Sequence, residues 1–219
     1  MTAASWLRRL AARRTRAPAD ARRWIVLDVE ASGLDVSRDR LLAIAAVGVH
    51  LAGDRAHIAL ADSFEVVLRQ PEAAAPPDKS NILLHGIGVG AQRHGVEAAQ
   101  ALDAFTRFVS QAPLLGFHVG FDRALIERAC SRLGRLAPHG RWLDLEPLAA
   151  ALHSQVKASA LDDWLAHFGI RCLRRHDATA DALATAELLL HLWPALRAEH
   201  ATDFDAARAL AARRRWLAA

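Results

Sequence analysis

The sequence predicts an α/β protein with one sheet of mixed strand direction, flanked by helices. Strand-like segments come first, helices and short strands alternate after them, and no linker divides the 219 residues. A chain of this length suffices for one domain with a full hydrophobic core. Hydrophobic residues make up 53% and charged residues 24%, as in globular proteins, and no apolar run reaches the roughly 18 residues of a membrane span.

The first part of the chain predicts an antiparallel meander. Three segments rich in β-branched and apolar residues, 24–30, 41–50 and 63–70, follow one another closely. Turns that contain Gly or Asp separate them. The prolines of 71–81 then predict a loop.

Alternating helices and strands are predicted in the middle of the chain. Apolar residues at helical spacing indicate a helix over 96–110, and 113–119 resembles a short buried strand. A helix over 121–134, closed by Gly134, follows. Residues 141–152 fit a strand that runs into a helix.

Helices are predicted for the rest of the chain. Residues 159–170 and 179–193 have amphipathic patterns, and Pro194 ends or kinks the second helix. A last helix is expected over 203–217.

The charge is unevenly placed along the chain. Residues 1–23 carry seven arginines against one acid, a net charge of +6, so the remainder is −2 because the whole chain is +4. A basic arm suits a phosphate backbone or an acidic surface, although a solvated tail has the same composition. We expect a basic arm over 1–23, the main domain over 24–193 and a helical extension over 194–219.

Cysteine usage and the N-terminal pattern indicate the compartment. Cys130 and Cys172 have no CxxC spacing, so we expect neither a disulfide framework nor a zinc site, but two small hydrophobic side chains in a reducing environment. The basic N-terminus lacks the uninterrupted apolar stretch of a secretory signal. We therefore expect a cytoplasmic protein without membrane association.

The first strand ends with two carboxylates on one face. Side chains alternate along a strand, so Asp28 and Glu30 point the same way and the residue between them points away. Like charges this close suit a solvated edge, a basic partner or a divalent cation. Two more acids lie at the ends of elements: Asp122 after a strand, and Asp181 five residues after His176. Each alone is explained by the helix dipole, which favours acids in a first turn.

Taken together, these acids lie in the patterns DxExSGLD, HxxFD and HxxxxDA, in that order. The set resembles the three exonuclease motifs of the DEDDh family, in the DnaQ-like 3′–5′ exonuclease superfamily. This superfamily includes the proofreading epsilon subunit of bacterial DNA polymerase III. The resemblance runs from about Trp24 to Trp193. It departs from the family at Ser32, where Thr is usual, and at Val119, where Asn is common.

The resemblance implies a ribonuclease H-like fold that gathers four acids around two Mg²⁺ or Mn²⁺ ions. Hard oxygen ligands select such ions. Asp28 would bridge both ions, Glu30 and Asp181 would complete the first, and Asp122 would hold the second. His176 would act as the general base. A sister branch uses tyrosine in the third motif, but this chain contains no tyrosine.

Contacts with substrate are implied in and between the motifs. His85 and Ile87 either line a pocket for the terminal base or belong to a plain loop. His118 either contacts substrate, or packs in the core or against the residues of the site. The residues implied to bind substrate are Ser32, Gly33, Leu34, His85, Ile87, His118 and Phe121.

The function implied is a metal-dependent 3′–5′ exonuclease that releases nucleoside 5′-monophosphates from single-stranded 3′ ends, with DNA as the preferred substrate. An exoribonuclease that trims RNA or degrades oligoribonucleotides is the alternative, because the motifs do not encode how the sugar is read. A third reading is an inert nucleic-acid-binding module, which the presence of all four acids and the histidine disfavours. A DNA polymerase is a candidate partner, although residues 194–219 resemble a helix rather than a flexible tether.

Overall fold

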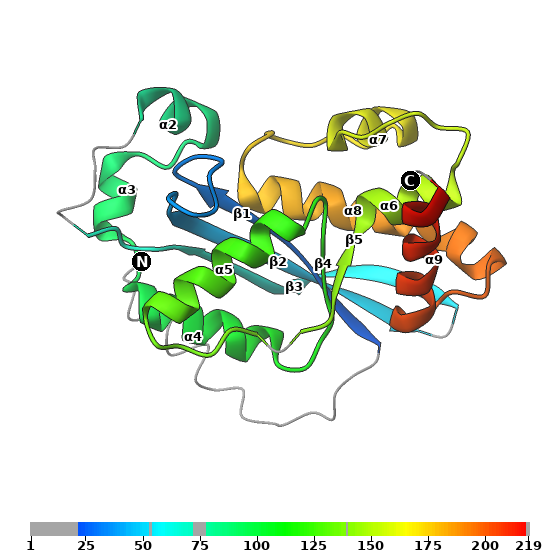
Figure 1. The fold of residues 1–219 in the computed structure, drawn as a ribbon, viewed down its shortest axis with the longest axis horizontal. Coiled ribbons are helices and arrows are strands. Elements are labelled where there is room, and N and C mark those ends of the chain that lie inside the picture. Colours follow the sequence, from blue (N-terminus) through cyan, green and yellow to red (C-terminus); the bar gives the residue numbers. More distant parts are fainter. Residues whose placement is uncertain (1–21, 53, 72–77, 139, 218–219) are drawn as a thin grey trace.

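The computed structural model describes residues 22–52, 54–71, 78–138 and 140–217. Its five strands form one sheet in the order β3–β2–β1–β4–β5 (Figure 1). The first three strands pair antiparallel, whereas β4 runs parallel to β1 and β5 runs parallel to β4. The predicted mixed sheet is therefore confirmed. The strands are β1 (Arg23–Ala31), β2 (Leu41–Ala52), β3 (Arg55–Val67), β4 (Leu114–Gly116) and β5 (Trp142–Asp144).

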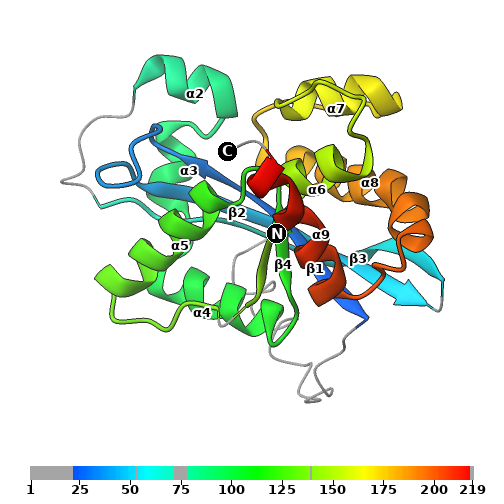
Figure 2. The ribbon, with the colours of Figure 1, turned by 45° about the vertical axis from the view of Figure 1, so that its right-hand side comes forward.

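Helices cover both faces of the sheet. Helices α4 and α5 lie on one face, and α6, α8 and α9 lie on the other (Figure 1). Both views place α2 and α7 at the same end of the molecule, with the chain that leads into α8 passing between them (Figures 1 and 2). Across the described ranges, no helix combines the length and apolar character of a membrane span. The helices are α2 (Lys79–His85), α3 (Val89–His94), α4 (Ala98–Val109), α5 (Gly120–Arg132), α6 (Leu145–Leu152), α7 (Leu161–Phe168), α8 (Ala178–Ala198) and α9 (Phe204–Leu217).

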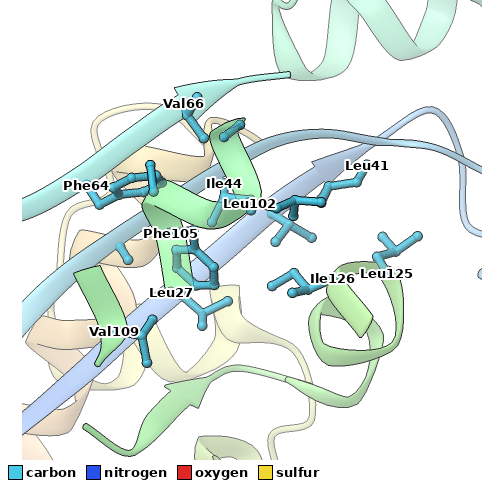
Figure 3. Packing of buried hydrophobic residues seen from close by; sticks show 14 of the residues in the cluster. Leu27, Leu41, Ile44, Phe64, Val66, Leu102, Phe105, Val109, Leu125 and Ile126 are labelled. Atoms are coloured by element: carbon cyan, nitrogen blue, oxygen red, sulfur yellow. The ribbon is translucent and has the colours of Figure 1, made fainter. Parts of the chain in front are cut away.

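The central strand β1 is buried on both faces. Ile25, Leu27 and Val29 point into the hydrophobic cluster under α4 and α5, which Figure 3 shows around Leu27 and Phe105. Trp24 points the other way, into the cluster under α6, α8 and α9. Burial of each large apolar side chain stabilises the fold by about 1.5–3 kcal/mol. A charged residue on this strand therefore requires a specific environment.

The third strand is longer than predicted. It begins at Arg55 instead of residue 63, because residues 55–59 continue the pairing along Gly48–Ala52 of β2. A register shift lies between Val47 and Gly48. The pairing with β2 extends the strand over residues whose mixed polar pattern did not indicate one.

Two boundaries near prolines also differ from the prediction. The predicted loop over 71–81 ends earlier, because α2 starts at Lys79 and Asp78 caps it by accepting the backbone N–H of Ser80 (2.8 Å). Pro194 does not end its helix. Helix α8 continues to Ala198, and Leu196 in its last turn is fully buried, so packing offsets the hydrogen bond that proline removes.

The predicted strand over 113–119 is reduced to three residues, since the chain turns into α5 at Gly120. At the C-terminal end, Phe204 of α9 packs edge-on against Trp24, with ring centroids 6.0 Å apart. Residues 1–21, most of the basic arm, lie outside the described residues. The domain boundaries at 23 and 193 stay predictions.

Candidate active site

Asp28 and Glu30 extend the row of side chains that begins with Trp24 on one face of β1. Their partners across the ladder in β2 are Ala45 and Ala43. These small residues leave space beside the carboxylates, and Ala45 packs against two alanines in the first turns of α8. A register shift follows directly after Glu30, where the strand stops pairing regularly and a loop begins. The predicted shared face thus lies beneath the start of α8.

Asp181 lies in the first turn of α8 and is 4% exposed. Its Oδ2 accepts the backbone N–H of His176 (2.9 Å). Its Oδ1 accepts a weak hydrogen bond from the Cys172 thiol (3.3 Å) and also forms an ion pair with Arg175. Both oxygens of this buried carboxylate are therefore tied to the chain that leads into the helix.

Asp122 reaches the same edge of the sheet from α5. Strands β1 and β4 are parallel, so their carboxyl ends meet, and ligands of open α/β sheets bind at such edges. Gly116 ends β4 in close contact with β1: a Cβ there would lie 3.1 Å from the carbonyl oxygen of Leu27. The Asp122 carboxylate is buried and accepts the backbone N–H of Val29. The side chain is thereby fixed beside the residue that separates Asp28 from Glu30.

Burial and the charges of neighbouring acids raise the pKa values of three of these acids. Desolvation raises the pKa of Asp28 well above its ordinary value, and the charges of Asp122, Asp181 and Glu30 raise it further. Desolvation, followed by the charge of Asp181, raises the pKa of Glu30 to about 8. Desolvation also raises the pKa of Asp122 to about 7, against the hydrogen bonds from two backbone N–H groups. Near neutral pH, such a cluster must bind protons or be compensated by positive charge.

The donor set fits a hard divalent cation by charge and by ligand type. Carboxylate oxygens are the ligands that Mg²⁺ and Mn²⁺ prefer. Among the described residues, however, no three His, Cys, Asp or Glu side chains lie close enough together to hold a metal ion. The guanidinium of Arg175 lies against Asp181 instead, and its charge lowers the pKa of both Asp28 and Glu30.

His176, the predicted base, lies in the loop before α8 with an exposed side chain. Its backbone adopts the left-handed region with φ of 61°, which costs a non-glycine residue roughly 1–3 kcal/mol. The hydrogen bond from its N–H to Asp181 holds this conformation. The position of the imidazole therefore depends on the acid that follows it five residues later.

The loop after β1 contains three of the residues predicted to bind substrate. Ser32 Oγ donates to Asp39 Oδ1 (2.9 Å), so the hydroxyl closes the loop on itself. A Cβ at Gly33 would lie 2.5 Å from an oxygen of the same carboxylate, so a larger residue there would displace the Asp39 side chain. Leu34 is 90% exposed. This leucine extends into solvent four residues after Glu30.

His85 is the last residue of α2, and Ile87 lies in the short connection between α2 and α3. His85 is buried, and its Nδ1 accepts the backbone N–H of Ile87 (2.9 Å). Desolvation, together with the charge of Arg174, lowers the pKa of His85. Ile87 packs against Ala43, the ladder partner of Glu30. Ile87 is thereby close to the acidic face, and His85 is connected to it through the hydrogen bond with the Ile87 backbone.

His118 lies in the turn after β4, and Phe121 lies in the first turn of α5. His118 is exposed, has φ of 55°, and donates its backbone N–H to Asp144 Oδ1 (2.9 Å). Phe121 is half-buried and packs against the cluster under α4 and α5. The roles of both residues in substrate binding stay predictions.

Three residues at the cluster were missed by the sequence analysis. Arg175 and Cys172 contact Asp181, and Asp177 caps α8 while its charge helps to raise the pKa of Glu30. For Arg175, the sequence offered only its position next to His176, and the same segment also contains Arg171 and Arg174. Spacing alone does not show which of them faces inward.

A cleft of about 330 Å³ lies along α5, away from the acids. Leucines form much of its wall, and Arg69, Arg128 and Arg132 are at its rim. None of the predicted catalytic residues lines it.

A mixed five-stranded sheet with acids at the carboxyl ends of its central strands defines a ribonuclease H-like nuclease domain. The model of the exonuclease family named RNase_T matches residues 25–189, most of the chain. The chain belongs to this family, within the DnaQ-like 3′–5′ exonuclease superfamily.

Two relatives show how much of a longer protein this chain resembles. It is 27% identical over 169 residues to the PolC-type DNA polymerase III of Caldanaerobacter subterraneus, covering 77% of this chain and 11% of that protein. It is 28% identical over 196 residues to a DNA polymerase III subunit epsilon-like protein of Rhodobacter capsulatus, covering 86% of this chain and 26% of the other. The chain thus spans about a tenth and about a quarter of these relatives.

Solved structures share the fold. Escherichia coli exonuclease I in complex with a dT13 oligonucleotide matches with a TM-score of 0.68 at 17% identity, over 81% of this chain and 42% of that one. The zinc-bound form of the same enzyme with single-stranded DNA matches with a TM-score of 0.65 at 19% identity, over 78% of this chain and 40% of that one. The expected ribonuclease H-like fold is therefore confirmed.

Proposed function

We propose that this protein is a metal-dependent 3′–5′ exonuclease that removes nucleoside 5′-monophosphates from single-stranded ends. One observation supports the proposal: Asp28, Glu30 and Asp122 all have raised pKa values, and the charge of Asp181 contributes to the rise at Asp28 and at Glu30. An acid cluster that mainly stabilised the fold would be paired with bases. Within the described part of the chain, the guanidinium of Arg175 is the one that pairs with this cluster, so the remaining charge favours divalent cations.

Each acid has a role that follows from its place. Asp28 and Glu30 project from a rigid strand, Asp181 and Asp122 from the first turns of two helices, so the four would hold two Mg²⁺ or Mn²⁺ ions from three directions. Such a pair of ions neutralises the scissile phosphate and lowers the pKa of a water molecule. Asp28 would be among the residues that hold the ions, because, besides desolvation, the charges of the three other acids all raise its pKa.

His176 supplies the proton transfer. Its backbone is bound to Asp181 and its imidazole is exposed, and this imidazole would accept a proton as water adds to phosphorus. The bond from phosphorus to the 3′-oxygen then breaks, and that oxygen takes up a proton to become the new 3′-hydroxyl. The released nucleotide retains the phosphate at its 5′ carbon.

The terminal nucleotide would lie between the loop after β1 and the end of α2. Leu34 is exposed on one side, and Ile87 and His85 lie on the other. The Nε2 atom of His85 is buried without a hydrogen-bond partner among the described residues. Leu34 and Ile87 would contact the apolar face of the terminal base, and His85 Nε2 would make one polar contact with it.

DNA is the proposed substrate because the relatives are named as DNA polymerase III proteins and the similar structures include exonuclease I with DNA oligonucleotides. The same names make a DNA polymerase the proposed class of partner. RNA remains the alternative that the experiment must separate.

The test uses 5′-labelled single strands of DNA and RNA, each with Mg²⁺, Mn²⁺ or EDTA. We expect a ladder that shortens one nucleotide at a time from the 3′ end of DNA and stops in EDTA. Asp28→Asn should produce no ladder, while Asp163→Asn on the exposed face of α7 serves as the charge-matched control. Undiminished digestion in EDTA or by Asp28→Asn would contradict the proposal. A ladder on RNA but not on DNA would show that RNA, and not DNA, is the substrate.

A further inference from the structure

Arg175 is a cation that contacts the acid cluster through Asp181. Its guanidinium forms an ion pair with Asp181 and a second one with Asp162, which lies in the first turn of α7. The Asp181 side chain is 6% exposed and that of Asp162 is 65% exposed. One guanidinium thus connects a buried carboxylate at the site to a solvated carboxylate beside it.

The ion pair with Asp181 is incompatible with metal binding at the same oxygen. Asp181 Oδ2 already accepts the N–H of His176, and Oδ1 is the atom that faces Arg175. A divalent cation on Oδ1 would meet the guanidinium at close range, and like charges repel strongly where water is scarce. Metal binding at Oδ1 therefore requires Arg175 to leave Asp181.

Asp162 offers the place to which it can move. Its Oδ1 already accepts the Nε–H of Arg175, so a rotation of the side chain can release Asp181 while keeping the pair with Asp162. Asp162 is exposed, so the displaced guanidinium regains water at the same time. The side chain has two partners, one inside the cluster and one outside it.

We propose that Arg175 is a built-in counter-cation that neutralises the centre in the metal-free protein and transfers to Asp162 when metal binds. This inference rests on the metal-dependent function proposed above and adds a regulatory element to the same site. It makes two opposite demands. Removal of Arg175 should strengthen metal binding. Removal of Asp162 should weaken metal binding, because Arg175 then has Asp181 but no longer Asp162 to pair with.

A plain structural ion pair would behave differently. If Arg175 merely anchored the loop 171–177 between α7 and α8, its loss would lower stability equally with and without metal. Metal affinity would then stay constant or fall. The direction of the change in affinity separates the two roles.

The experiment measures Mn²⁺ affinity by isothermal titration calorimetry on the full chain, and melting temperature in EDTA and in Mn²⁺. Arg175→Gln is compared with Arg171→Gln, an exposed arginine of the same loop. We expect Arg175→Gln to bind Mn²⁺ about tenfold more tightly, within the range of coupled sites, and to melt lower than wild type only in EDTA. Equal or weaker affinity would overturn the proposal.

A second pair keeps the test decisive if Arg175→Gln does not fold without metal. Asp162→Asn is compared with Asp163→Asn, its exposed neighbour in the same helical turn. Asp162→Asn should weaken Mn²⁺ binding several-fold while Asp163→Asn should not, and equal affinities would refute the transfer. If neither wild type nor any variant binds Mn²⁺, the proposed metal-dependent function fails as well; if wild type binds but the pairs do not differ, only the role of Arg175 fails.

Discussion

Replacement of Glu30 by glutamine should stabilise the metal-free protein at alkaline pH even though it abolishes activity. Desolvation and then the charges of Asp181, Asp177 and Asp122 raise the pKa of Glu30 from 4.5 to about 8. Between these pH values the folded protein retains a proton that the unfolded chain has released. The stability contributed by Glu30 is therefore full below pH 4.5 and is lost as the pH rises to about 8.

The size of this effect follows from the two pKa values. Each pKa unit corresponds to about 1.4 kcal/mol, so the difference between 4.5 and about 8 corresponds to about 5 kcal/mol. Glu30 is partly exposed, and solvent screening reduces the expected change to about 2–4 kcal/mol. Glutamine is neutral like protonated glutamate. The variant should match wild type near pH 5 and exceed its free energy of unfolding by about 2–4 kcal/mol near pH 9.

The assay is urea unfolding followed by tryptophan fluorescence in EDTA, at pH 5 and pH 9. Glu187→Gln, on the half-exposed side of α8, is the control and should lose stability with pH as wild type does. Added Mg²⁺ should restore wild type at pH 9 and leave Glu30→Gln unchanged. A variant whose stability falls with pH as steeply as that of wild type would refute the reasoning.

Three further outcomes are expected. Asp28→Ala should eliminate digestion with an unchanged far-ultraviolet circular dichroism spectrum; residual normal activity would remove Asp28 from the metal centre. His176→Ala should lower turnover by about 10²–10⁴-fold while Mn²⁺ affinity measured by calorimetry stays constant, and a wild-type rate would exclude it as the base. Deletion of residues 1–20 should weaken binding of single-stranded DNA at low salt but not at high salt, because phosphate contacts are lost with ionic strength. Equal affinity at low salt would leave the arm without a role in binding.

Local chemistry explains which parts of the fold could be predicted. The alternation along 24–30 placed Asp28 and Glu30 on one face, because strand geometry itself has a period of two. The order of elements predicted the mixed sheet. The start of β3 at Arg55 could not be predicted in this way, since Arg55 and His57 enter the strand through pairing with β2 rather than through their own propensity.

In the candidate site, too, some residues could be predicted from the sequence and others could not. Motif spacing named the four acids and His176, whereas the approach of Asp122 to Val29 depends on the parallel pairing of β4 with β1. Arg175 could not be selected among neighbouring arginines, because its contact with Asp181 exists only in the folded chain. Long-range pairing and side-chain direction are the information that the sequence pattern lacks.

The central claim is that the four carboxylates bind a pair of divalent cations, and a crystal structure grown with Mn²⁺ tests it most directly. Anomalous scattering should reveal two ions about 4 Å apart, ligated by Asp28, Glu30, Asp122 and Asp181. Manganese absent from this edge of the sheet, or bound elsewhere at saturating concentration, would contradict the account.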